Sequence, residues 1–127
     1  MLLSINKKAR YYIDYFKPKE LNISFQNLAL FPNEKLHTRL NKIDCNYNKL
    51  KKLTNTLPEN LKTLDCHNNI ITKLPDILPD SIKFLNCSNN KLIKLPTTLP
   101  FNLLILSCEN NKLNKLPYNL PNNIYIL

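Results

Sequence analysis

Glycine is absent from this sequence of 127 residues, although average usage of about 7% predicts roughly nine. Glycine is needed where a backbone turns sharply or touches a phosphate. The sequence therefore contains no P-loop, dinucleotide-binding fingerprint, kinase glycine-rich loop, nucleophile elbow or EF-hand loop. Acidic residues are also few, with 9 Asp and Glu against 18 Lys and Arg. The resulting net charge of +9 favours anionic surfaces without saying which.

Long apolar segments are missing as well. No apolar run approaches the roughly 20 residues of a membrane span, and Lys7, Lys8 and Arg10 interrupt the amino-terminal segment before a signal-peptide core forms. We therefore expect a soluble intracellular protein. Hydrophobic residues make up 43% of the chain, which suffices for one domain with a core. The sequence contains 25 leucines and 21 asparagines, a pairing that indicates a repetitive scaffold.

The chain repeats itself every 21 residues. Four cysteines mark the interval: Cys45, Cys66, Cys87 and Cys108. The clearest copy reads Leu61-x-x-Leu64-x-Cys66-x-x-Asn69-x-Ile71-x-x-Leu74-Pro75-x-x-Leu78-Pro79. This is the L-x-x-L-x-L-x-x-N/C-x-L signature, so the chain is similar to the leucine-rich repeat family.

The resemblance extends to two kinds of repeat. The doubled Leu-Pro steps resemble the short repeats of bacterial effector proteins. Cysteine in the third strand position, with a bias to Asn, Lys and Ile, resembles versions from large DNA viruses of amoebae. The resemblance implies recognition of a protein partner rather than catalysis. The expected location is the cytoplasm, either of the cell that makes the protein or of a host cell.

The repeats divide the chain into two parts. About four regular copies begin at residue 40, and an incomplete copy runs from Ile124 to Leu127. A degenerate copy is expected 20 residues before the first regular one, with Leu28 where the repeat asparagine belongs. Residues 20–127 thus form the solenoid, and the apolar spacing in residues 1–19 predicts an N-terminal helical cap.

The same pattern predicts the architecture of each coil. Apolar and polar residues alternate in segments such as Leu64-Asp65-Cys66, which indicates a half-buried strand. The Leu-Pro pairs forbid a long helix. The expected fold is a leucine-rich repeat solenoid of the α/β horseshoe class, with short parallel strands on the concave face and extended or 3₁₀ segments on the convex face. Two buried structural ladders are expected: Asn48, Asn69, Asn90 and Asn111, whose amides satisfy backbone groups, and Cys45, Cys66, Cys87 and Cys108 as reduced thiols.

The residues that usually carry chemistry have the wrong arrangement here. A 21-residue interval places the thiols in a line, so neither a metal site nor disulfides are expected. Alternation along a strand turns Cys66 and His67 to opposite faces, which excludes a cysteine-histidine pair. The carboxylates of Asp44 and Asp65, about 5 Å apart near His67, are the best catalytic candidate. They lie on an open sheet that does not exclude water, so we expect no enzyme and no cofactor.

The exposed side of the strands is therefore the candidate binding surface, for a protein partner rather than nucleic acid or a membrane. Its C-terminal part is apolar, and this stripe is either an interaction site or the surface that a C-terminal cap covers. The expected rows are Lys42, Thr63, Phe84, Ile105 and Ile126; then Asp44, Asp65, Asn86 and Ser107; then Asn46, His67, Ser88 and Glu109. The expected partner contacts are Thr63, Phe84, Ile105, Asp44, Asp65, Asn86, His67, Ser88 and Glu109.

Two other functions stay open. A convex lysine ridge could bind nucleic acid or an anionic membrane electrostatically. It comprises Lys52, Lys73, Lys94 and Lys115, joined by Lys49, Lys91 and Lys112. The chain could instead be a truncated repeat fragment without independent activity. Apolar residues 124–127 also predict self-association through a C-terminal edge strand.

Overall fold

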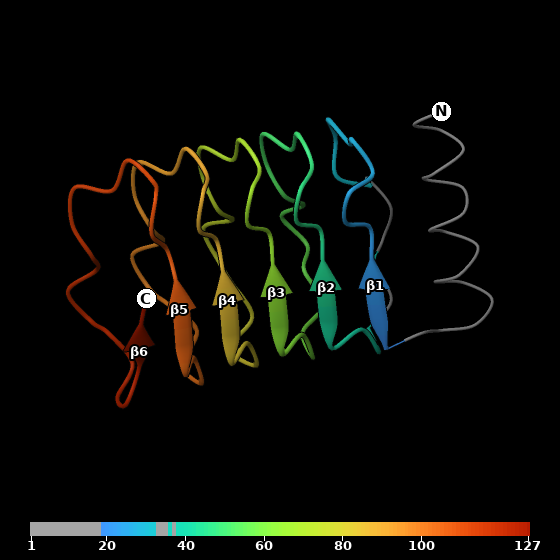
Figure 1. The fold of residues 1–127 in the computed structure, drawn as a ribbon. Coiled ribbons are helices and arrows are strands. Elements are labelled where there is room, and N and C mark those ends of the chain that lie inside the picture. Colours follow the sequence, from blue (N-terminus) through green and yellow to red (C-terminus); the bar gives the residue numbers. More distant parts are fainter. Residues whose placement is uncertain (1–18, 33–35, 37) are drawn as a thin grey trace.

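The computed structural model describes residues 19–32, 36 and 38–127, which form a solenoid with one short strand in each coil (Figure 1). The predicted helical cap at residues 1–19 lies, apart from Lys19, outside these residues. The six strands are parallel and lie in sequence order in a single sheet. They are β1 (Glu20–Asn22), β2 (Lys42–Asp44), β3 (Thr63–Asp65), β4 (Phe84–Asn86), β5 (Ile105–Ser107) and β6 (Tyr125–Ile126).

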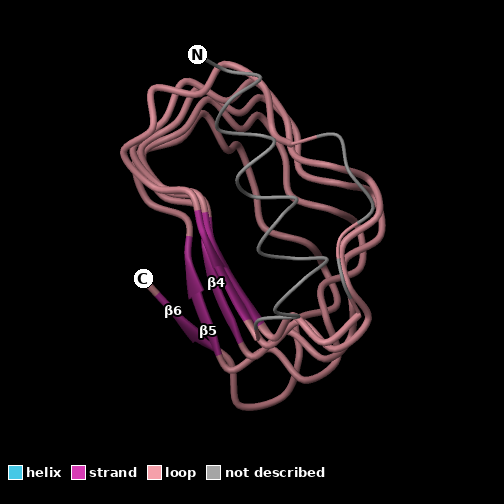
Figure 2. Ribbon diagram, turned by 90° about the vertical axis from the view of Figure 1, so that its right-hand side faces the viewer, coloured by secondary structure: helices cyan, strands magenta, loops and turns pink. Residues whose placement is uncertain are grey.

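Each strand buries one side and exposes the other. The middle residue of each three-residue strand points into the core, while its two neighbours are exposed or half-buried. Viewed along the solenoid, the strands form one wall and loops form the others (Figure 2). No helix occurs in the described part of the chain, in agreement with the helix-breaking Leu-Pro pairs. The predicted leucine-rich repeat solenoid is confirmed.

One hydrophobic core runs through all the coils. Leucine and isoleucine side chains from successive repeats stack inside the coil, and twelve of the large ones are almost completely buried. A single coil cannot bury its leucines alone, so the coils are stable only as a stack. The continuous cluster also contains the four cysteine side chains.

A ladder of asparagine amides connects neighbouring coils. The Oδ1 atoms of Asn69 and Asn90 accept hydrogen bonds from the backbone N–H groups of Leu50 and Ile71, one coil earlier, at 2.9 Å. Asn48 and Asn111 accept the equivalent bonds at the same distance. Each Nδ2 donates to backbone carbonyls of its own coil and of the preceding one, at 2.8–3.3 Å. The buried amides therefore satisfy backbone groups that the bend after each strand leaves unpaired.

The residue before each ladder asparagine has a left-handed backbone. Asn68, Asn89 and Asn110 have φ values of 51°, 52° and 56° at this position. Glycine usually occupies such positions, but asparagine tolerates them better than most other residues. This explains how a chain without glycine bends at every repeat. The first two coils instead place Phe25 and Tyr47 here, with φ of 54° and 50°.

The degenerate first copy is offset from the prediction. β1 pairs with β2 at an interval of 22 residues, so that Leu21 lies beside Ile43, whereas we expected an interval of 20. Leu28 therefore does not occupy the asparagine position. The Leu28 N–H donates to Asn48 Oδ1, just as the Leu50 N–H donates to Asn69 Oδ1, so Leu28 is the equivalent of Leu50. Gln26, two residues before Leu28, occupies the ladder position. A leucine is favoured there because the site lies in the apolar core.

The last copy is also offset, in the opposite direction. β6 pairs with β5 at an interval of 20 residues, placing Tyr125 beside Ile105 and Ile126 beside Leu106. The prediction that Ile126 lies in the exposed row is therefore wrong, because its half-buried side chain packs against the core. The left-handed backbone of Asn123, with φ of 65°, turns the chain one residue early. Tyr125 is exposed in its place.

The ladder predicts that Asn90→Leu destabilises the protein, although it adds apolar area. The backbone N–H of Ile71 would lose its partner in the core, and the carbonyl of Cys66 would keep only its bond from Asn69 Nδ2. We expect the free energy of unfolding to fall by about 1–3 kcal/mol in urea titrations. Asn114→Leu makes the same change at an exposed site and serves as the control. A variant at Asn90 as stable as the control would contradict the ladder.

Candidate functional site

The exposed face of the sheet, called here the concave face, brings the predicted rows together. The first row consists of Glu20, Lys42, Thr63, Phe84, Ile105 and, at the corrected position, Tyr125. Its character changes along the solenoid from polar to apolar. Phe84 and Tyr125 are 42% and 65% exposed, and Leu104, directly before β5, is 44% exposed. The C-terminal half of the concave face therefore presents an apolar stripe to solvent.

The second row caps the turn that follows each strand. Asp44, Asp65 and Asn86 are adjacent in the register of β2, β3 and β4. Each accepts a hydrogen bond through Oδ1 from the backbone N–H two residues further on, at 3.2 Å. These side chains are half-buried. They therefore stabilise the bend. The second carboxylate oxygen of Asp44 and Asp65 and the Nδ2 of Asn86 can still contact a ligand.

The third row is less exposed than predicted. Ser88 is buried, with 3% exposure, and its Oγ donates to Asn86 Oδ1 at 2.7 Å. It therefore positions Asn86 and is not itself accessible to a partner, which corrects its assignment as a contact. His67 is half-buried, and its Nδ1 atom lies 2.5 Å from Oδ1 of Asp65. Glu109 is exposed at the C-terminal end of this row.

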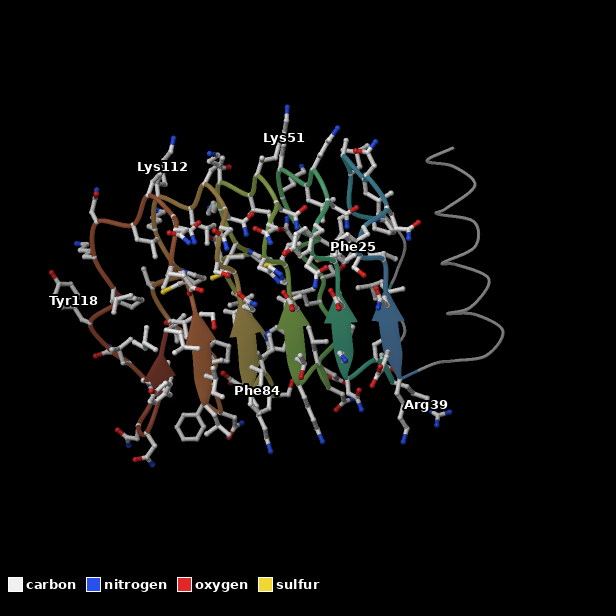
Figure 3. All side chains as sticks on the ribbon, in the orientation of Figure 1. Phe25, Arg39, Lys51, Phe84, Lys112 and Tyr118 are labelled. Carbon is white, nitrogen blue, oxygen red and sulfur yellow. The ribbon has the colours of Figure 1, made fainter. Side chains whose placement is uncertain are left out.

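Two aromatic residues that the sequence analysis missed lie on the two coils before His67. The ring of Phe25, labelled in Figure 3, stacks on that of Tyr47 with centroids 4.4 Å apart, and His67 meets Tyr47 edge-on at 5.1 Å. Both aromatic residues are exposed and have a left-handed backbone, which is costly for bulky residues. The signal was present in the sequence. Phe25 and Tyr47 occupy the repeat position that later coils fill with asparagine.

The burial of Asn46 was also missed by the sequence analysis. Its side chain is buried with 8% exposure, and Oδ1 has no hydrogen-bond partner among the described residues. An unpaired buried acceptor costs about 1–3 kcal/mol. It shares its repeat position with His67, one coil further on. The N-terminal end of the concave face therefore has a buried acceptor without a hydrogen bond, unlike the regular coils that follow.

The four cysteines are inert side chains of the core. All are buried as free thiols, and none of the described residues forms a His, Cys, Asp or Glu group able to hold a metal ion. Burial raises the pKa of all four thiols, and nearby negative groups add to the effect. Cys66 points into the core while His67 lies on the concave face, as alternation predicted. A neutral buried thiol is a poor nucleophile and a poor metal ligand.

Comparison with solved structures finds leucine-rich repeat proteins of bacterial pathogens. YopM from Yersinia enterocolitica WA-314 is 30% identical to this chain with a TM-score of 0.83, and the match covers 95% of this chain and 26% of the YopM chain. A Shigella effector leucine-rich repeat domain is 29% identical, has a TM-score of 0.83, and covers 98% and 53%. YopM, a leucine-rich effector from Yersinia pestis, is 34% identical, has a TM-score of 0.79, and covers 94% and 33%. Protein-family models and curated proteins give no match.

The fold, the repeat signature and these similarities define the chain as a leucine-rich repeat protein. Its repeats are similar to those of the bacterial effector structures. The chain spans between 26% and 53% of the length of the three structures. Among the described residues, no helix has the length and apolar character required to cross a membrane.

The raised thiol pKa values predict how stability depends on pH. Since the folded chain keeps the Cys66 proton, only the unfolded chain releases it above the ordinary thiol pKa of about 8.5. The free energy of unfolding should therefore fall as the pH rises, by up to about 1.4 kcal/mol per pH unit for this thiol. Urea titrations of the intact chain and of Cys66→Val across this range isolate the effect. Parallel pH profiles of the two proteins would refute it.

Proposed function

We propose that the chain is a non-enzymatic module that binds a protein partner on its concave face. The observation that carries the proposal is the apolar stripe of Phe84, Ile105 and Tyr125, flanked by Leu104, on the exposed side of the sheet. Such side chains cost free energy in water and gain it when a partner covers them. The fold itself, which the similar proteins use as a repeat scaffold, supports recognition rather than chemistry.

Polar groups surround the stripe in the arrangement of a binding interface. Asn86 lies on the same strand as Phe84, and Asp65 and His67 lie on the preceding coil, where they can accept or donate hydrogen bonds at the margin of the apolar stripe. Protein interfaces commonly combine an apolar centre with a polar rim. The stacked rings of Phe25 and Tyr47 extend the surface at its N-terminal end. Exposed aromatic rings often supply much of the binding energy at such sites.

The charge of the concave face differs from that of the whole chain. Its described rows carry four carboxylates, on Glu20, Asp44, Asp65 and Glu109, and one lysine, Lys42. Lys42 lies 3.9 Å from Glu20. The chain as a whole has a net charge of +9, so most of the basic residues are elsewhere. The concave face therefore favours a partner surface that is apolar or basic over one that is acidic.

The Phe84→Asp variant tests the proposal directly. A charge in the middle of the apolar stripe should weaken partner binding at least about thirtyfold, which is the effect of losing an interface hot spot. The intact chain and the variant are used to capture proteins from a lysate, and the affinity of each captured protein is then measured with purified components. The Ile105→Asp variant repeats the test on the next strand.

The control is Tyr118→Asp, which places a charge at a 91% exposed ring in the loop after Asn111, outside the strands. It should bind the same partners as the intact chain. Thermal unfolding of all the variants shows whether each has folded. If folded Phe84→Asp and Ile105→Asp proteins retain full affinity, the concave face is not the binding surface.

A further inference from the structure

Eight of the 18 basic residues of the chain lie on one surface away from the concave face, with a single acidic residue among them. We call this surface the lysine flank, defined as residues 49–56, 70–77, 91–98 and 112–119, the segments that follow each asparagine ladder residue. It contains eight lysines and a single carboxylate, Asp76, a formal charge of +7 out of +9 for the chain. Asp76 pairs with Lys73 at 2.9 Å. The other seven lysines have no ion pair among the described residues.

The lysines of the flank are arranged in rows along the solenoid. Lys51 and Lys112 extend from the same edge of the molecule, beyond the ends of the strands (Figure 3). All eight are exposed. Because successive coils place equivalent residues about 4.8 Å apart, the rows form a continuous band of positive potential.

Apolar side chains lie within this band. Ile77, Ile93 and Tyr118 are 84%, 59% and 91% exposed, and the Lys115 ammonium lies 5.4 Å from the centre of the Tyr118 ring. The sequence analysis considered the lysines only as charge, and so missed this combination. Solvation explains exposed lysines, but it does not explain large apolar side chains exposed between them.

Grooves between neighbouring coils combine the same two chemistries. One groove of about 380 Å³ is lined by Lys94 and Lys115 together with Leu95 and Leu116. A second of about 160 Å³ is lined by Lys73 and Lys94 with Leu74 and Leu95, and Asp76 also borders it. A third of about 500 Å³ has Lys51 and Lys52 beside Phe31 and Leu53. Ammonium groups thus lie beside apolar surface at three places along the flank.

We propose that the lysine flank binds the surface of an anionic lipid bilayer. Lysines attract the anionic head groups, each contributing about fivefold to partitioning, and the exposed isoleucine and tyrosine side chains enter the boundary between head groups and acyl chains. Nucleic acid fits less well. It offers phosphates to the lysines but nothing that buries Ile77 or Ile93, and Tyr118 is the only aromatic residue of the flank.

This surface is separate from the proposed protein-binding face. The concave face is formed by the strands, whereas the flank follows the bend at the end of each strand. The two carry opposite charge. A chain held on a membrane by the flank would therefore keep Phe84 and its neighbours free to bind a partner.

Co-sedimentation with vesicles tests the proposal. The full chain is mixed at low ionic strength with vesicles of phosphatidylcholine alone and with vesicles of equal parts phosphatidylcholine and phosphatidylserine. We expect it to sediment with the second kind only, and added salt should weaken the binding. Failure to sediment with the anionic vesicles would overturn the proposal.

Two double variants separate the contributions of charge and apolar contact. Lys94→Gln with Lys115→Gln should weaken binding to the anionic vesicles about thirtyfold, because two lysines are lost. Ile77→Ser with Ile93→Ser should weaken it at least about tenfold without changing the charge. All four side chains are exposed, so the variants should fold, and thermal unfolding checks this.

Controls distinguish a lipid surface from other polyanions. Lys62→Gln with Lys83→Gln removes the same charge at the opposite, starting ends of the strands and should leave vesicle binding close to that of the intact chain. Phe84→Asp should also leave it unchanged. The isoleucine variant and the intact chain should bind single-stranded DNA with equal affinity, because they carry the same charge. If that variant retains full vesicle binding, or if the Lys62 and Lys83 control loses as much as the flank variant, the flank is not a lipid-binding surface.

Discussion

The hydrogen bonds of the buried asparagines set the register on which the rest of the structure depends. Burial of leucine drives the coils together, but it is non-directional and does not select one alignment of neighbouring strands. A slip of one residue would turn every core side chain outward. The amides of Asn69 and Asn90 prevent it, because each bonds to specific backbone groups of its own coil and of the preceding one.

A fixed register turns sequence position into surface position. Residues 21 apart in the sequence lie side by side on neighbouring strands. A row on the surface therefore consists of the residues at one repeat position, and a substitution at that position changes only that row. The rows on the strands are polar, with several carboxylates, at the N-terminal end and apolar at the C-terminal end. The rows after the bend became basic with exposed isoleucines. Two surfaces of different chemistry thus share one core, and neither needs an enclosed pocket.

The regular coils were predictable from the sequence because their period is constant, and the strands, their parallel order and the buried cysteines follow from it. The two ends were not. The intervals of 22 and 20 residues depend on local turns, such as the left-handed backbone at Asn123, which a constant period does not indicate. The burial of Ser88 and the stacking of Phe25 on Tyr47 depend on side-chain contacts between coils. Periodicity places residues in rows, but does not show which side chains in a row touch.

Amide hydrogen exchange tests the role of the ladder most directly. The backbone N–H groups of Leu50, Ile71 and Leu92 lie outside the strands and donate to asparagine side chains of the next coil. If the ladder fixes the register, these three amides should exchange only through global unfolding, at the same free energy as the core strands. Exchange at the faster rates of exposed turns, while the strands stay protected, would contradict the account.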